Sequence, residues 1–277
     1  MQFQGAGVRL AGDRWDVTEG QPARGSLLLL HGGGQTRHSW HKSSSRFARR
    51  GWTTYTVDAR GHGNSEWASD GNYTMDAMVA DLHAIVASLE SAPVLVGASM
   101  GGMTSLVAQG ESAELARALV LVDIAPRTEP VGVKRITDFM SSNPDGFASL
   151  DEVVDAVQAY NPHRNRPRNL DGLKKNVRLR DNGRWYWHWD PAFLDFGDES
   201  SRKISTGRLY EAARSIDVPT LLVRGTNSDV VSAEGAEELR QLIPTARIEE
   251  AAAGHMVAGD DNDVFPEQVV RFLDEAL

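Results

Sequence analysis

The segment APVLVGASMGGMTSLVAQG, residues 92–110, decides how the rest of this 277-residue chain is interpreted. The short apolar run Val94–Val96 leads directly into small residues around Ser99, and a helical spacing of Met103, Leu106 and Val107 follows without a loop. A continuous apolar run is typical of a parallel strand that is buried on both faces. The segment therefore predicts a strand, a tight turn at Ser99 and a helix.

Ser99 stands between Gly97 and Gly101 in the pattern G-x-S-x-G, which is the nucleophile elbow when a strand precedes it and a helix follows. Such a turn presents the serine hydroxyl above the sheet. The helix that begins at Met100 offers free N–H groups to a developing oxyanion. The alternative is a serine that only caps the helix; the strand–turn–helix context favours the nucleophile.

Further apolar runs alternate with helical patterns along the chain. Runs that predict strands are Ser26–Leu30, Thr53–Val57, Ala118–Val122, Thr220–Val223 and, more weakly, Arg247–Glu250. Helical spacing covers residues 74–90, with Thr74 as the N-cap, and residues 232–243 and 263–277. This alternation predicts an α/β fold with a doubly wound, mostly parallel sheet. At the N-terminus, Val8–Leu10 and Arg14–Thr18 predict a hairpin that turns at residues 11–13.

The alternation stops between about Pro126 and Ile216, in a polar segment that is rich in Pro, Asn and Arg. An interruption of this length is too long for a plain loop, so it predicts an inserted helical cap at residues 126–216. Residues 1–125 and 217–277 then form the core. Within the insertion, the sequence Asp-Asn-Gly at 181–183 predicts a hairpin turn.

Three tryptophans follow that turn, Trp185, Trp187 and Trp189. They either pack the cap onto the core or form the wall of an apolar pocket above Ser99. The sequence leaves both open.

A serine nucleophile needs a base. His255 follows the last predicted strand and precedes the last helix, so it lies at the same sheet edge as Ser99. Asp229, just past a strand end and before His255, is the predicted acid, because it fits the chain order Ser, Asp, His. Asp123 also ends a strand at this edge and is the alternative acid.

The second oxyanion N–H is predicted at Gly33, in the segment HGGG that follows a strand directly. Three glycines let the bare backbone approach a substrate carbonyl. A phosphate-binding loop is the competing interpretation, but no Gly-Lys-Ser/Thr follows and the chain is acidic.

Composition excludes several classes of protein. A net charge of −9 disfavours nucleic acids and anionic membrane surfaces as partners. The absence of cysteine excludes disulfides, thiolate metal sites and a cysteine nucleophile. Neither a secretory signal nor an apolar run long enough to span a membrane is present, which predicts a cytoplasmic protein. The oligomeric state is not encoded in these features.

Five segments together resemble the α/β-hydrolase fold family: residues 31–40, 57–65, 97–102, 221–232 and 253–263. The similar branch is that of small capped hydrolases, which includes esterases and proteins like epoxide hydrolases and non-haem peroxidases. The resemblance implies that Gly33 supplies the second oxyanion N–H. It does not decide between the two aspartates, because the family uses either strand end. Epoxide hydrolases and haloalkane dehalogenases of this fold use an aspartate nucleophile, and Ser99 stands at that position.

These features predict a serine hydrolase that cleaves a small, apolar carboxylic ester, thioester or lactone through an acyl-enzyme, without a metal or organic cofactor. Two alternatives stay open. The same catalytic residues could serve C–C bond hydrolysis or perhydrolysis, and a hydrolase-fold ligand receptor would have little turnover.

Overall fold

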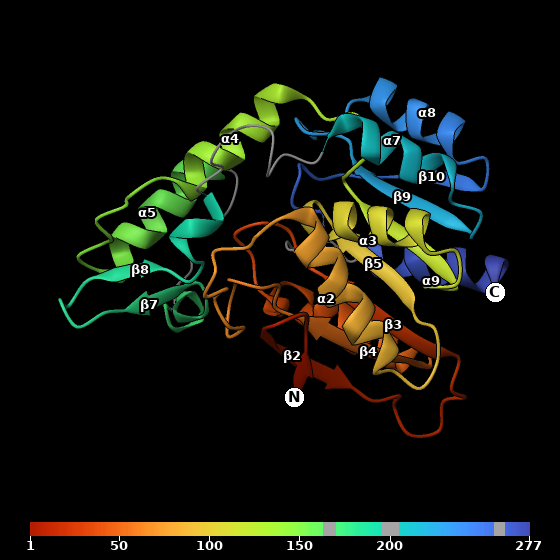
Figure 1. Cartoon of the computed structure of the whole chain (residues 1–277), viewed down its shortest axis with the longest axis horizontal. Helices are drawn as coiled ribbons and strands as arrows, with labels where there is room; N and C mark the ends of the chain where they lie inside the picture. The colour runs from red at the N-terminus through yellow and green to blue at the C-terminus, as the bar shows by residue number, and fades with distance from the viewer. Residues whose placement is uncertain (163–169, 195–204, 258–263) are drawn as a thin grey trace.

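A computed structural model describes residues 1–162, 170–194, 205–257 and 264–277 (Figure 1). In this part of the chain, eight strands form one sheet in the order β1-β2-β4-β3-β5-β6-β9-β10. These strands are β1 (Gln2–Gln4), β2 (Arg9–Trp15), β3 (Gly25–Leu30), β4 (Trp52–Val57), β5 (Val94–Ala98), β6 (Ala118–Val122), β9 (Thr220–Gly225) and β10 (Ala246–Ala251). β1 and β2 pair antiparallel, and from β4 to β10 every neighbouring pair is parallel. The predicted mostly parallel α/β sheet is confirmed.

The N-terminal hairpin differs from its prediction. Gly12 does not form a turn; it lies inside the continuous strand β2, opposite Val57 of β4. The hairpin turns earlier, where Gly5 donates its N–H to the carbonyl of Val8 and β1 pairs with β2. The sequence Ala-Gly-Asp at 11–13 is therefore strand, because pairing with both neighbouring strands outweighs its turn propensity.

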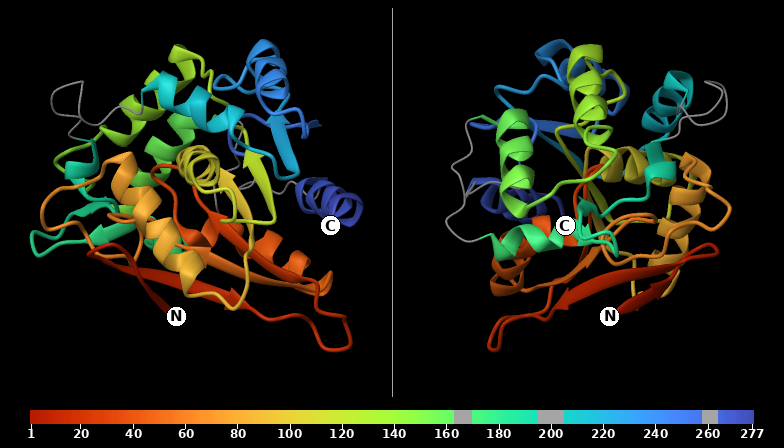
Figure 2. Two further views of the ribbon diagram at one scale, coloured as in Figure 1. Left: turned by 45° about the vertical axis from the view of Figure 1, so that its right-hand side comes forward. Right: turned by 90° about the vertical axis from the view of Figure 1, so that its left-hand side faces the viewer.

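Helices cover both faces of the sheet (Figures 1 and 2). The helices are α1 (His41–Arg49), α2 (Met75–Ala87), α3 (Met100–Glu111), α4 (Pro130–Met140), α5 (Leu150–Tyr160), α7 (Thr206–Arg214), α8 (Ala233–Leu242) and α9 (Val264–Ala276), with the 3₁₀ turns η1 (Arg37–Trp40), η2 (Asp171–Lys175) and η3 (Pro191–Leu194). The side chain of Thr74 accepts a hydrogen bond from the N–H of Ala77, which confirms it as the N-cap of α2.

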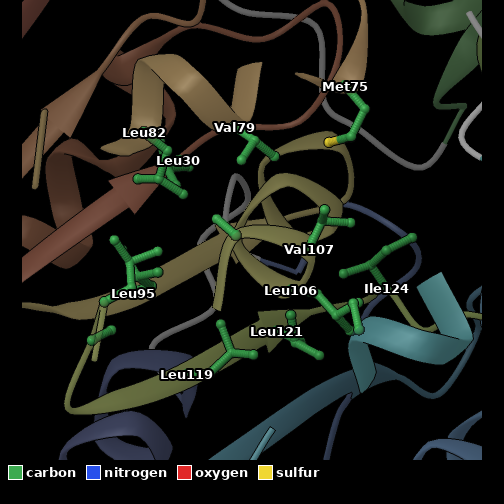
Figure 3. Close-up of a cluster of buried hydrophobic side chains, with 14 of the residues drawn as sticks. Leu30, Met75, Val79, Leu82, Leu95, Leu106, Val107, Leu119, Leu121 and Ile124 are labelled. Carbon is green, nitrogen blue, oxygen red and sulfur yellow. The ribbon is translucent and has the colours of Figure 1, made fainter. Parts of the chain in front are cut away.

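Side chains of the central strands alternate between two buried clusters. Leu27 and Leu29 of β3 belong to a cluster that includes side chains of α1 and α9, whereas Leu28 and Leu30 belong to a cluster that includes side chains of α2, α3, α7 and α8. The second of these clusters is drawn in Figure 3, where side chains from α2, α3 and the strands meet. Burial on both faces explains why these strands are continuous apolar runs in the sequence.

The predicted insertion lies between β6 and β9, and its residues 163–169 and 195–204 are outside the described part of the chain. Helices α4 and α5 and the hairpin β7 (Val177–Leu179) with β8 (Trp185–Trp187) pack around their own apolar cluster and lie to one side of the sheet (Figures 1 and 2). The hairpin confirms the turn predicted at residues 181–183. Helix α7 instead packs on α3 and shares the core cluster.

No helix in the described ranges is both long enough and apolar enough to cross a bilayer.

A buried ion pair joins the N-terminal hairpin to α2. The guanidinium of Arg60 donates two hydrogen bonds to Asp81, at 2.7 and 2.8 Å, and both side chains are less than one-tenth exposed. Arg60 also donates to the carbonyl of Ala6, and the N–H of Ala6 donates to Asp81. Three segments thus meet at one charge pair.

We expect Asp81→Asn to lower the free energy of unfolding by about 3–5 kcal/mol, because it leaves the buried Arg60 charge without its counter-ion. The matched control is Asp138→Asn, which breaks the exposed pair of Asp138 with Lys134 on α4 and should cost less than about 1 kcal/mol. Urea unfolding of both variants measures the difference. Equal losses would contradict the role given to the buried pair.

Candidate active site

Ser99 occupies the strained turn that the sequence predicts. Its backbone has φ 46° and ψ −113°, a left-handed conformation that costs free energy in any residue with a side chain. Close packing of β5, α3 and β3 enforces the turn. A methyl group on Gly97 would lie 2.4 Å from the carbonyl oxygen of Gly101, and one on Gly101 would lie 2.5 Å from that of Leu30. Only glycine fits at either position.

The side chain of Ser99 opens into a cavity of about 410 Å³. The cavity is bounded on the core side by the loop Gly32–Gly34, by Ser99 and by His255, and on the other side by residues of α4, α5 and the segment after β8. Cap and core together therefore enclose the space above the predicted nucleophile. No direct hydrogen bond joins Ser99 to His255 within the described residues; such contacts often form only when substrate binds.

His255 is held by Asp123. Nδ1 of His255 lies 2.7 Å from Oδ2 of Asp123, whose side chain is fully buried. The carboxylate also accepts hydrogen bonds from the N–H of Gly225 at 2.8 Å and the hydroxyl of Ser228 at 2.5 Å. With Nδ1 on the carboxylate, the ring leaves Nε2 as its second functional nitrogen. Asp123 itself has a positive φ of 49°, so the turn after β6 is strained as well.

The predicted contact of Asp229 with His255 is wrong. The carboxylate of Asp229 forms two hydrogen bonds to the guanidinium of Arg135 on α4, at 2.8 and 3.0 Å, and its side chain is one-third exposed. Arg135 in turn stacks over the ring of Tyr160, which lines the cavity. Asp229 thus ties the loop after β9 to the cap. Its neighbour Ser228, which the sequence analysis did not single out, points into the site instead.

The order of strands explains this outcome. β6, which ends just before Asp123, lies directly beside β5, which ends just before Ser99; β9 is one strand farther away. The loop after β9 turns back, so that the Ser228 hydroxyl accepts the N–H groups of Val230 and Val231. This turn directs Asp229 outward. Chain order alone could not separate the two aspartates, but strand adjacency favours Asp123.

Of the two backbone N–H groups predicted to bind an oxyanion, that of Gly33 belongs to the glycine loop that lines the cavity with Ser99, and that of Met100 follows Ser99 directly in the chain. In the glycine loop, the N–H of Gly32 donates to Oε1 of Gln35, and the N–H of Gly34 donates to Nε2 of His62. Within the described chain, the intervening N–H of Gly33 has no acceptor, nor has that of Met100 at the start of α3. Both predicted donors are therefore unused in the described part of the chain, as binding of an oxyanion requires.

Two of the three tryptophans line the cavity, Trp187 and Trp189, and their rings stack with centroids 4.9 Å apart. Trp185 does not. It pairs with Phe147 through backbone hydrogen bonds in both directions and belongs to the packing of the hairpin. Trp185 and Trp187 are two residues apart on β8 and both pack in the apolar cluster of the cap. Only Trp187 and Trp189 reach the cavity.

Three buried histidines lie beneath the glycine loop. His31, His62 and His188 are at most 1% exposed, and their rings are in contact, with centroids 5.3 Å apart for His31–His62 and 5.8 Å for His62–His188. Burial, reinforced by the neighbouring His31, lowers the pKa of His62 to about 3. Burial also lowers the pKa of His31 and of His188. All three rings are therefore neutral at neutral pH.

These lowered pKa values predict that acid destabilises the fold. The unfolded chain takes up protons below its histidine pKa of about 6.5, whereas the folded chain does not until near pH 3 for His62. Stability is thus complete above pH 6.5 and decreases as pH falls, by up to about 5 kcal/mol from His62 alone.

Urea unfolding between pH 7.5 and 4.5 measures this dependence. His62→Gln, which cannot be protonated, should show a weaker decline over the same interval. Identical pH dependence in the two proteins would refute the assignment to His62.

The family model described as alpha/beta hydrolase fold matches residues 25–262. An esterase of Mycobacterium tuberculosis, Rv0045c, is 31% identical over 258 residues, which cover 90% of this chain and 82% of that protein. The sn-1-specific diacylglycerol lipase ABHD11 of Mus musculus is 28% identical, with 94% and 84% covered.

Solved structures agree with this result. A structure of the Mycobacterium tuberculosis esterase superposes with a TM-score of 0.76 at 29% identity, covering 99% of this chain and 91% of the other. The structure of an E-2-(acetamidomethylene)succinate hydrolase reaches a TM-score of 0.80 at 21% identity, covering 99% and 98%, and so shares the fold. The chain belongs to the α/β-hydrolase fold family and is an enzyme of that family.

Proposed function

We propose that the protein is a serine hydrolase that cleaves a small carboxylic ester, thioester or lactone through an acyl-enzyme. The observation that carries the proposal is the chain of groups from the buried Asp123 carboxylate through His255 to the cavity that Ser99 enters. A carboxylate, an imidazole and a serine at a nucleophile elbow are the parts of acyl transfer. The relatives named esterase and lipase support ester hydrolysis as the reaction.

In the proposed reaction, Oγ of Ser99 attacks the substrate carbonyl carbon while Nε2 of His255 takes the hydroxyl proton. The N–H groups of Gly33 and Met100 bind the oxyanion of the tetrahedral intermediate. His255 then gives its proton to the departing alcohol or thiol, and the acyl group stays on Ser99. Water, deprotonated by the same histidine, releases the acid.

Asp123 has an electrostatic role in this scheme. Its carboxylate accepts the Nδ1–H of His255, fixes the tautomer and stabilises the imidazolium that forms when the serine loses its proton. The hydrogen bonds from Gly225 and Ser228 hold the carboxylate in place in its buried position.

The residues that the insertion contributes to the cavity favour substrates with an apolar acyl group. Phe139, Met140, Trp187 and Trp189 line the cavity opposite Ser99, and all four come from the cap. We therefore assign acyl selection to α4, α5 and the hairpin, within the proposed cap at residues 126–216. Helix α7 packs with the core and takes no part in it.

Ser99→Ala should abolish turnover of a short p-nitrophenyl ester and labelling by a fluorophosphonate, because it removes the attacking oxygen. The fold should be unchanged, since the side chain makes no packing contact that alanine lacks. Ser88→Ala, at the distant end of α2, is the control and should retain full activity. Full activity in Ser99→Ala would contradict the proposal, and an absence of wild-type turnover on an ester and lactone panel would favour a receptor or C–C bond cleavage.

Asp123→Asn and Asp229→Asn form a matched pair for the acid. Asp123→Asn should lower kcat by about 10⁴-fold, because asparagine cannot hold the required tautomer of His255. Asp229→Asn should change kcat by less than about 3-fold, because its partner is Arg135 and the exposed pair contributes little. Steady-state kinetics with thermal melts of both variants measures the contrast. The opposite ranking would assign the acid to Asp229.

A further inference from the structure

The orientation of the Gly33 N–H depends on a histidine. Nδ1 of His31 donates to the carbonyl oxygen of Gly32 at 2.8 Å, while its Nε2 accepts the N–H of Ala59 at 3.0 Å. The carbonyl of Gly32 and the N–H of Gly33 belong to one planar trans peptide group and point in opposite directions. By holding the carbonyl, His31 therefore fixes the direction of the N–H that faces the cavity.

A second ring holds the next peptide group. Nε2 of His62 accepts the N–H of Gly34 at 3.2 Å, and its Nδ1 donates to the carbonyl of Arg60 at 3.1 Å. Gly34 has φ 71°, a left-handed conformation suited to glycine, and this turn gives the loop its shape. The hydrogen bond to His62 thus fixes the loop on the far side of the Gly33 N–H.

A third ring, from the cap, holds the peptide group after that. Nδ1 of His188 accepts the N–H of Gly63 at 2.8 Å, so its Nε2 carries the proton and donates to the carbonyl oxygen of Gly34 at 3.3 Å. His188 follows β8 and stands between the cavity-lining Trp187 and Trp189. It is the point at which the substrate-facing wall of the cap is bonded to the glycine loop.

We infer that His188 is a positioning residue for the oxyanion hole: with His31 and His62 it holds the three successive peptide groups between Gly32 and Gln35. Each ring uses one nitrogen as donor and the other as acceptor, which only a neutral imidazole can do. His188 alone comes from the cap, so it joins acyl recognition to the alignment of Gly33. The inference rests on the proposed function, because Gly33 matters only if an oxyanion forms.

Two amide variants separate the two hydrogen bonds of His188. Asparagine carries an acceptor where Nδ1 lies and can keep the bond to Gly63, but it does not reach Gly34. Glutamine is longer and places an amide N–H where Nε2 lies, so it restores the donor to Gly34. Both variants remove the imidazole ring, and both introduce an uncharged side chain.

We expect His188→Asn to lower kcat roughly 10- to 100-fold on a p-nitrophenyl ester, with KM changed less than about 2-fold. The loss is smaller than the 10²–10³-fold found when an oxyanion donor is deleted, because the Gly33 N–H is displaced and not removed. His188→Gln should recover most of kcat.

A trifluoromethyl ketone of the same acyl chain gives the second readout. Its carbonyl carbon bonds to Oγ of Ser99, the serine proton passes to His255 and the carbonyl oxygen becomes an oxyanion in the hole. Its inhibition constant should rise in His188→Asn by the factor lost in kcat/KM. The inhibition constant of the corresponding ether, which forms no oxyanion, should stay unchanged.

An unchanged kcat in folded His188→Asn would overturn the inference, as would equal losses in both variants together with a raised KM. If His188→Asn does not fold, His62→Asn replaces it, because that change removes the acceptor of the Gly34 N–H one peptide group earlier. Failure of the proposed function is seen separately, as an absence of Ser99-dependent turnover in the wild-type protein.

Discussion

The contact of α3 with β5 and β3, at which no side chain larger than hydrogen fits on Gly97 or Gly101, is the constraint on which the site depends. The helix can follow the strand directly only because this contact is so close. The turn between them then forces Ser99 into its left-handed conformation. The free energy for that strain comes from the buried core on both sides of the sheet, which keeps β5 and α3 in place.

A second strained turn, at Asp123 on the neighbouring strand, places the carboxylate next to the same sheet edge. Ser99, His255 and Asp123 therefore lie at one sheet edge although they are far apart in the chain, because parallel strands bring their carboxyl ends to the same edge. The cap adds its own polar connection, since His188 is bonded to the glycine loop. Neutral histidines are suited to this buried position, where a charged group would need a counter-ion.

The sequence predicted the parallel sheet and the elbow well, because continuous apolar runs and a glycine-flanked serine are local signals. The partner of His255 was mispredicted because Asp123 and Asp229 have the same local signature, a position after a buried strand. The difference between them lies in strand order and in the turn at Ser228, which are tertiary features. The N-terminal hairpin was misplaced for a similar reason, since strand pairing on both sides of Gly12 cannot be read from its neighbours in the chain.

The hydrogen bonds of Asp123 also connect the two ends of the insertion. Its N–H donates to the carbonyl of Val223 in β9, and its carboxylate accepts from Gly225 and Ser228 just beyond that strand. The chain leaves the core after Asp123 and returns to it before β9, so the points of exit and re-entry are bonded to each other independently of what lies between them. The exit and the return therefore keep their spacing at this sheet edge. The intervening segment can change in length and sequence during evolution, or be exchanged by design, without moving them.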